Sequence, residues 1–250
     1  MNDGADMQSG AASNMETGAE LSILAGALAG AVCTRPLAAV VRTLPTAVLR
    51  EWAHDPQSVP QAVPLQGAAL GCFAAGCMAL PALAALQHGG SWEAVWISIL
   101  AWGLWVLAWI DVETRLLPDR LTLGLLWLGL LVNLADAFAP LADAVLGAVV
   151  GYASLFLLNA AYRRVRGREG MGAGDFKLLA AIGAWFGVAS LPAVVMIAAG
   201  SGVILGCALL LAGRRESGEA IAFGPHLCLG AAAMMYADAW IRPLLGALAR

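Results

Sequence analysis

Eight apolar stretches follow one another along the chain, separated by short polar segments. They lie at about 21 to 41, 66 to 87, 92 to 110, 121 to 139, 141 to 162, 177 to 190, 191 to 213 and 220 to 241. Most approach the roughly 20 residues that a helix needs to span a bilayer, and none shows the alternation of a barrel strand. Because lipid offers the backbone no water to bond, the pattern predicts an all-α polytopic integral membrane protein with about eight transmembrane helices.

The composition supports this fold class and excludes some partners. Of the 250 residues, 60% are hydrophobic and only 12% are charged, which is too little polar surface to cover a soluble globule. A net charge of -3 gives no basic field, so we expect the lipid bilayer and not nucleic acid as a partner. The five cysteines never form a Cys-x-x-Cys pair, so we expect small buried hydrophobic residues and no metal site.

The sequence predicts an N-terminal tail followed by two membrane regions. Residues 1–20 are small, polar and acidic and carry no Lys or Arg, which is typical of a disordered tail and not of a cleaved signal. We expect residues 21–90 to hold the N-terminal helices with a short cytoplasmic loop at about 42 to 65. Residues 91–250 should form a second membrane domain.

The distribution of basic residues predicts a topology. With eight helices and the N-terminus outside, the inner connections hold twelve of the fourteen Lys and Arg residues, and only Arg242 and Arg250 lie outside. The positive-inside rule therefore predicts that both termini lie outside the membrane and that the basic connections face the cytoplasm.

Two aspartates stand at boundaries of apolar stretches. Asp111 follows the third stretch and Asp175 precedes the sixth, with a complete hairpin of two spans between them. Both carboxyl groups should therefore reach the same cytoplasmic face. Two carboxyls that share a site do not ionise together easily, so one keeps its proton while the other stays anionic, as in aspartic proteases.

The residues around Asp175 also have simpler explanations. Gly172 and Gly174 would permit strained backbone and close approach of a substrate strand, and Lys177 would bias Asp175 toward its anion or face phosphate headgroups. Alternatively, Asp175 is an ordinary helix cap, and Asp111 is an interfacial residue paired with Arg115. The occurrence of both aspartates on one face, with a Pro118-Asp119 turn nearby, favours a functional pair.

Three motifs resemble those of one family. The segment from Asp111 through Leu117-Pro118-Asp119 to Thr122 resembles the first signature of the type IV prepilin peptidases, and Gly172-Ala173-Gly174-Asp175 resembles their GxGD motif. The segment Phe223-Gly224-Pro225 resembles the start of their last helix. The three motifs stand in the family's order and cover about residues 92 to 245.

The resemblance implies an intramembrane aspartic endopeptidase of the bacterial inner membrane. Such an enzyme removes the leader of prepilins or pseudopilins at the cytoplasmic face, as in type IV pilus and type II secretion systems. The family's catalytic aspartates correspond to Asp111 and Asp175. Asp119 is carried over only as a supporting position, with Pro118 shaping its turn. Proteolysis of this kind needs no cofactor and no metal.

The N-terminal part resembles the bifunctional family members only loosely. Those enzymes also methylate the new N-terminus with S-adenosylmethionine, and most carry two Cys-x-x-Cys pairs in the following loop. Here the loop at about 42 to 65 contains no cysteine, so residues 21–90 are interpreted as a degenerate methyltransferase-like region. S-adenosylmethionine is expected only if methylation is retained.

Two other classes of function stay open at this point. A transporter or proton relay would use Asp111 and Asp175 to bind cations, and would place acids at mid-membrane and break its helices there. A non-catalytic scaffold of a pilus or secretion assembly would need no carboxyl pair. His226, which follows the Phe-Gly-Pro segment, is a further candidate for contact with the site. The pairs Gly147/Gly151 and Gly202/Gly206 predict close packing of helices, within the chain more than between copies.

Overall fold

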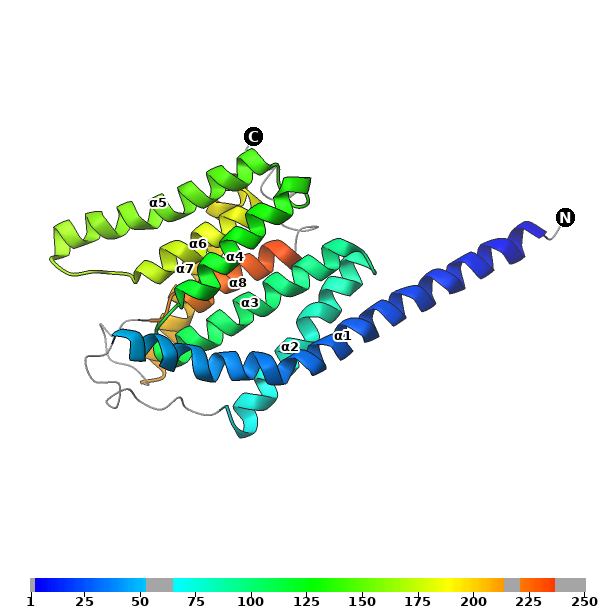
Figure 1. Cartoon of the computed structure of the whole chain (residues 1–250), viewed down its shortest axis with the longest axis horizontal. Coiled ribbons are helices and arrows are strands. Elements are labelled where there is room, and N and C mark those ends of the chain that lie inside the picture. The colour runs from blue at the N-terminus through cyan, green and yellow to red at the C-terminus, as the bar shows by residue number, and fades with distance from the viewer. Residues whose placement is uncertain (1–2, 53–64, 214–220, 237–250) are drawn as a thin grey trace. The chain divides into compact units, whose positions relative to one another are not determined.

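A computed structural model describes residues 3–52, 65–213 and 221–236, and all regular structure in these ranges is helical (Figure 1). The helices are α1 (Asp3–Trp52), α2 (Gly67–His88), α3 (Trp92–Thr114), α4 (Asp119–Val132), α5 (Leu141–Arg166), α6 (Ala173–Phe186), α7 (Leu191–Leu211) and α8 (Gly224–Tyr236). Two short 3-10 turns, η2 (Asn133–Ala135) and η3 (Val188–Ser190), extend α4 and precede α7. Each predicted apolar stretch thus holds one helix, which confirms the all-α prediction.

Five of these helical segments are long and apolar enough to cross a membrane. They are Thr17–Val48, Gly67–His88, Trp92–Thr114, Leu141–Arg166 and Val188–Leu211. The remaining three, α4, α6 and α8, have 14, 14 and 13 residues. At 1.5 Å per residue such helices rise about 20 Å, which is shorter than the ~30 Å hydrocarbon core of a bilayer. The protein is a polytopic membrane protein in which long helices accompany three short ones.

The start of the chain differs from the expected disordered tail over residues 1–20. The structure has α1 running from Asp3 to Trp52, and it also extends the helix into the loop expected at 42 to 65. Alanine, methionine and glutamate, which are frequent in the acidic segment, have high helix propensity and can continue an adjoining apolar helix. Residues 53–64 of the expected loop lie outside the described residues.

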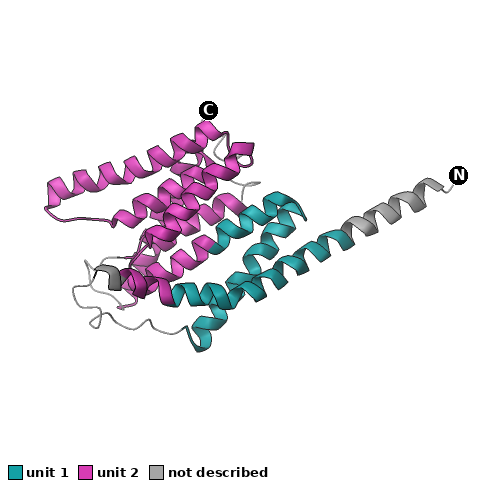
Figure 2. Ribbon diagram, viewed as in Figure 1, with its two compact units in different colours: residues 1–42, 63–102 teal, residues 43–62, 103–250 magenta. Residues whose placement is uncertain are grey.

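The chain divides into two compact units, which Figure 2 shows in different colours. The first comprises residues 1–42 and 63–102, and the second comprises 43–62 and 103–250, so the division falls inside α3 and not at residue 90. In the first unit a small residue sets the spacing of α1 and α2, because a Cβ atom on Gly26 would lie 2.7 Å from the Pro81 carbonyl oxygen. The indole of Trp102 donates to the Cys77 carbonyl over 2.9 Å.

In the second unit, α6 is the central helix. Every residue from Leu178 to Trp185 is buried, and the helix packs against α4, α5 and α8. Gly147 and Gly151 on α5 face α6, and Cβ atoms there would collide with the Gly183 and Leu179 carbonyl groups. This confirms that the first small-residue pair serves packing within the chain.

Polar side chains tie the far end of α6 to its neighbours. The Asn133 amide donates to the carbonyls of Ala184 and Trp185, each over 2.9 Å, and its oxygen accepts from the Phe138 and Ala139 amides. The Trp185 indole donates to the Leu125 carbonyl over 2.8 Å. Buried polar groups without such partners would be costly, so these bonds also fix the position of α6 along its axis.

The Gly147→Ala variant should be destabilised. Its methyl group would meet the backbone of α6, which cannot rotate away, so we expect a loss of about 1–3 kcal/mol and a lower melting temperature in detergent. The matched control is Gly124→Ala in α4, where a Cβ atom would meet no described atom within 4 Å. Equal melting temperatures of the two variants would contradict the close packing of α5 on α6.

Candidate active site

Asp111 lies in the last turn of α3, immediately before the turn that leads into α4. Arg115, with a left-handed φ of 55°, follows the helix, and its amide still donates to the Asp111 carbonyl over 2.9 Å. Pro118 stands before the first residue of α4 with φ -63° and ψ 128°, and its carbonyl accepts from the Leu121 and Thr122 amides. The turn thus has a defined shape, as the Pro118-Asp119 pair predicted.

Asp175 lies in the first turn of α6. Gly172 precedes the helix in an extended conformation, and the Asp175 amide donates to the Gly172 carbonyl over 3.2 Å. The residue is therefore part of the start of a helix whose remainder is the core of the unit.

The structure brings the two carboxyl groups together. Asp111 and Asp175 are only 4% and 7% exposed, and they lie close enough for their charges to interact. Cys228 of α8 lies within electrostatic range of both. The predicted proximity of two aspartates that are far apart in sequence is present in the fold.

The third motif completes the site. The Gly224 amide, at the start of α8, donates to Oδ2 of Asp111 over 3.0 Å. A helix N-terminus carries a partial positive charge and favours an anion, so this contact stabilises the ionised form of Asp111. Sequence reasoning identified the Phe223-Gly224-Pro225 segment but missed this contact, since nothing local connects residues 111 and 224.

Leu117 lies at the centre of the three motifs. A Cβ atom on Gly174 would lie 2.7 Å from the Leu117 Cβ, and one on Gly224 would lie 3.3 Å from its Cδ1 and 2.6 Å from Oδ2 of Asp111. The absence of side chains at Gly174 and Gly224 therefore lets α6 and α8 approach the turn that follows Asp111. Leu117 belonged to the quoted motif, but sequence reasoning gave it no role.

Gly172 shows no strained backbone. Its φ is -74°, which any residue can adopt, and a Cβ atom would meet only the Asp175 carboxylate at 3.8 Å. Neither glycine has a left-handed φ, and Gly174 admits Leu117, whereas the close approach of a substrate strand stays a prediction for both.

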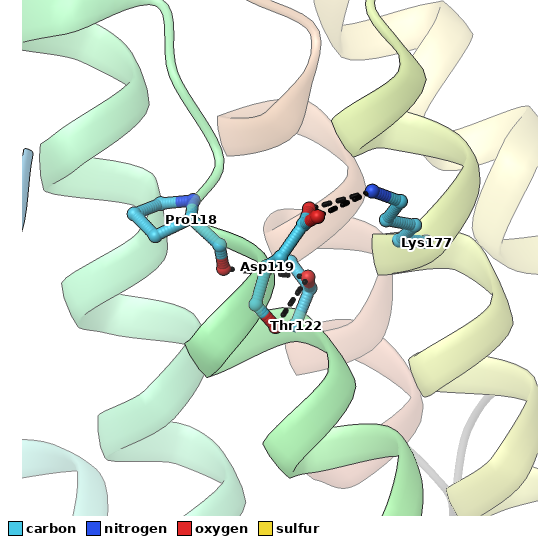
Figure 3. A network of polar contacts seen from close by, with 4 residues as sticks. All are labelled: Pro118, Asp119, Thr122 and Lys177. Atoms are coloured by element: carbon cyan, nitrogen blue, oxygen red, sulfur yellow. Dashed lines mark hydrogen bonds and ion pairs between the residues drawn. The ribbon is translucent and has the colours of Figure 1, made fainter. Parts of the chain in front are cut away.

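Lys177 also has a different partner from the one expected. Its ammonium contacts both carboxylate oxygens of Asp119, over 2.6 and 2.7 Å, as Figure 3 shows. The same view shows Thr122, whose hydroxyl donates to the Pro118 carbonyl over 3.3 Å. Lys177 therefore pairs with Asp119 instead of biasing Asp175.

A residue of α5 holds the segment that leads into α6. The Asn159 side-chain oxygen accepts from the amides of Gly170 and Met171, over 2.9 and 3.1 Å. The sequence offered one signal, a polar amide in an apolar helix, but it did not reveal the partner. His226, another candidate, is buried, and its Nδ1 lies 2.9 Å from the Ser201 hydroxyl of α7.

The charge state of the pair follows from its surroundings. Asp175 precedes the apolar part of α6 and lies outside the five long spans. Burial and the neighbouring Asp111 carboxyl raise the pKa of Asp175 to about 7, although a hydrogen bond with the Gly172 backbone opposes the shift. A pair with one anion and one retained proton can act as general base and general acid.

Among the described residues no group of three or more His, Cys, Asp or Glu side chains could hold a metal ion. The cysteines at 33, 72, 77, 207 and 228 are free thiols.

Comparison with known proteins agrees with the first two motifs, those that contain Asp111 and Asp175. Residues 98–207 match the model of the type IV leader peptidase family. A Stutzerimonas stutzeri protein named prepilin leader peptidase/N-methyltransferase is 45% identical over 163 residues, covering 65% of this chain and 56% of that protein. Proteins of the same name from Pectobacterium carotovorum and Neisseria gonorrhoeae are 48% identical over 163 residues and 46% over 145. The alignment with the Pectobacterium carotovorum protein covers 64% of this chain and 54% of that protein. The alignment with the Neisseria gonorrhoeae protein covers 58% of this chain and 49% of that protein.

The similarity is therefore regional. The chain spans about half the length of the curated relatives it matches. No solved structure matches it. The resemblance found in the motifs is confirmed for the segment that contains Asp111 and Asp175.

The Gly174→Ala and Gly172→Ala variants test the packing of the site. The first places a methyl group against Leu117 and should lower the free energy of unfolding by about 1–3 kcal/mol. The second adds only an ordinary contact and should melt close to the unsubstituted protein. If Gly172→Ala lowers the melting temperature in detergent as much as Gly174→Ala, the geometry described for Leu117 is wrong.

Proposed function

We propose that the chain is an aspartic endopeptidase that cleaves the leader peptide of type IV prepilins or pseudopilins, with Asp111 and Asp175 as its catalytic pair. The observation that carries the proposal is the buried carboxyl pair at the meeting point of three motifs. The regional similarity to proteins named prepilin leader peptidase/N-methyltransferase supports the substrate class.

The geometry divides the catalytic roles. Asp111, with its oxygen at the start of α8, is the anion and takes a proton from the attacking water. Asp175 holds the shared proton and donates it to the oxygen of the scissile carbonyl as the water oxygen bonds to the carbon. The intermediate then collapses, the carbon–nitrogen bond breaks, and the proton on Asp111 passes to the leaving amine. The carbonyl returns its proton to Asp175, so the pair ends with one proton, as it began.

The basic residues support an orientation in the membrane. If all eight helices cross the membrane, twelve of the fourteen Lys and Arg residues lie on one side of it, either on connections or towards the adjoining helix ends. By the positive-inside rule we infer that the N-terminus lies outside and that the carboxyl pair faces the cytoplasm of a bacterial inner membrane. The short helices α4 and α6, whose first turns are at the site, leave the pair near the membrane surface, where water and a cytoplasmic leader peptide can reach it.

Methyl transfer is not part of the proposal. The relatives' names include an N-methyltransferase, and S-adenosylmethionine is the donor that such a reaction uses in the resembling family. This chain has no Cys-x-x-Cys pair, and its described residues form no cluster for a metal. The residues therefore do not fit the metal site of bifunctional enzymes.

The positions of the aspartates disfavour the two alternatives. A transporter or proton relay would place its acids in the middle of long helices, whereas Asp111 and Asp175 lie in the last and first turns of theirs. A scaffold would gain nothing from two buried carboxyls, which cost free energy to keep out of water.

The Asp111→Asn and Asp175→Asn variants test the proposal. Each removes a group that general acid–base catalysis requires, so we expect cleavage of a co-expressed prepilin to fall by about a hundredfold or more. Mass spectrometry of the mature N-terminus reports cleavage and methylation together. The control is Asp143→Asn, an exposed carboxylate in the first turn of α5, which should cleave normally. Cleavage at the control rate by either active-site variant would exclude the proposed mechanism.

The pH dependence of cleavage provides a second test. With the pKa of Asp175 near 7, its proton is present below neutral pH and is lost as the pH rises. The rate should therefore decline on the alkaline side with an apparent pKa of the coupled pair close to neutrality. The melting temperature over the same range controls for unfolding. A rate that stays level from about pH 6 to about pH 9 would show that no group titrating near 7 must keep its proton.

A further inference from the structure

Lys177 is the only lysine in the sequence. The other thirteen basic residues are arginines. This single ammonium group lies two residues after Asp175 and contacts both oxygens of Asp119, over 2.6 and 2.7 Å. The pair is open to water, since the side chains of Lys177 and Asp119 are 26% and 51% exposed.

An exposed ion pair of this kind contributes little to global stability, because water screens the charges and two flexible side chains must be ordered. The two charged residues also occupy different positions in their helices. Asp119 is the first residue of α4, where the helix dipole favours a negative charge, whereas Lys177 is the fifth residue of α6, just past its first turn. The Asp119 carboxylate neutralises the charge of Lys177. The ion pair therefore affects the starts of α4 and α6 and contributes little to the stability of the whole protein.

The pair connects two segments that already contact each other at the site. Leu117, two residues before Asp119, packs on Gly174, which directly precedes Asp175. Two contacts, one apolar and one ionic, therefore fix the first turn of α6 against the turn that follows Asp111.

We propose that the Asp119–Lys177 ion pair is a positioning device that holds the first turn of α6, and with it Asp175, in register with Asp111. This inference rests on the proposed peptidase function. Lys177 and Asp119 touch neither the reacting groups nor the substrate in this account, so they are positioning residues. Their loss should reduce the turnover of bound substrate more than its binding.

The Lys177→Met variant should show this pattern. Displacement of a catalytic group by a fraction of an ångström is costly, so we expect kcat to fall by about tenfold to a hundredfold while KM changes less than about twofold. Asp119→Asn should have the same effect, and the double variant should be no worse than either one, because all three lack the same contact. The control is Arg164→Gln, which removes an exposed basic residue of α5 and should leave kcat unchanged.

The single lysine permits a second test without a change of fold. Acetylation of the purified protein removes the Lys177 charge and should lower kcat as the methionine variant does, whereas reductive dimethylation retains the charge and should preserve most of the activity. Lys177→Arg should stay active and be insensitive to both reagents. It also reports any effect of modifying the N-terminal amine.

The outcomes separate this inference from the proposed function. If Lys177→Met cleaves at the full rate while Asp175→Asn is inactive, the peptidase proposal stands and the positioning role is wrong. A loss of activity that matches a large fall in melting temperature, or a rise in KM alone, would also overturn the positioning role. Full activity of Asp175→Asn would instead remove the proposed function on which the inference rests.

Discussion

The rest of the second unit must accommodate two carboxyl groups, those of Asp111 and Asp175, that are buried and close enough for their charges to interact. An ionised carboxylate is strongly disfavoured in apolar surroundings, and two of them side by side are more so. The start of α8 offsets part of this cost through the Gly224 amide, which binds Asp111. A retained proton on Asp175 offsets the remainder. The asymmetry that a proteolytic pair requires therefore follows from how the fold accommodates the two groups.

Close approach of helices makes this arrangement possible. Gly174 and Gly224 admit Leu117 and the Asp111 carboxylate where a side chain would exclude them, and Gly147 and Gly151 bring α5 against the same α6. Along its length α6 is then fixed at both ends, by the Asn133 amide at one and by the Asp119–Lys177 pair at the other. A short helix that is buried from Leu178 to Trp185 and held near both ends is a rigid support for the proposed catalytic carboxyl group of Asp175 in its first turn.

Much of this could be predicted from the sequence, and the reason is the membrane. Hydropathy predicted eight helices because lipid permits few alternatives, and the alternation of spans placed residues 111 and 175 on one face. The same reasoning could not predict features that depend on contacts between distant segments. The partner of Lys177, the lack of a constraint at Gly172 and the bond from Gly224 to Asp111 all depend on which segments meet across 58 to 113 residues of sequence. The helix over the N-terminal segment was not predicted, because the small, polar and acidic residues there were interpreted as a disordered tail and their helix propensity was not considered.

The proposed site depends most on the meeting of Asp111 and Asp175, and crosslinking measures their proximity directly. In a background in which the five native cysteines are replaced by alanine, Asp111→Cys and Asp175→Cys are combined and treated with a short bifunctional thiol reagent. An arginine-specific protease then cuts at the exposed Arg166, which ends α5, and at Arg168, in the segment that leads to α6. We expect the two fragments to stay joined in the double variant and to separate in either single variant. Separation in the double variant, with both thiols shown to react, would contradict the shared site.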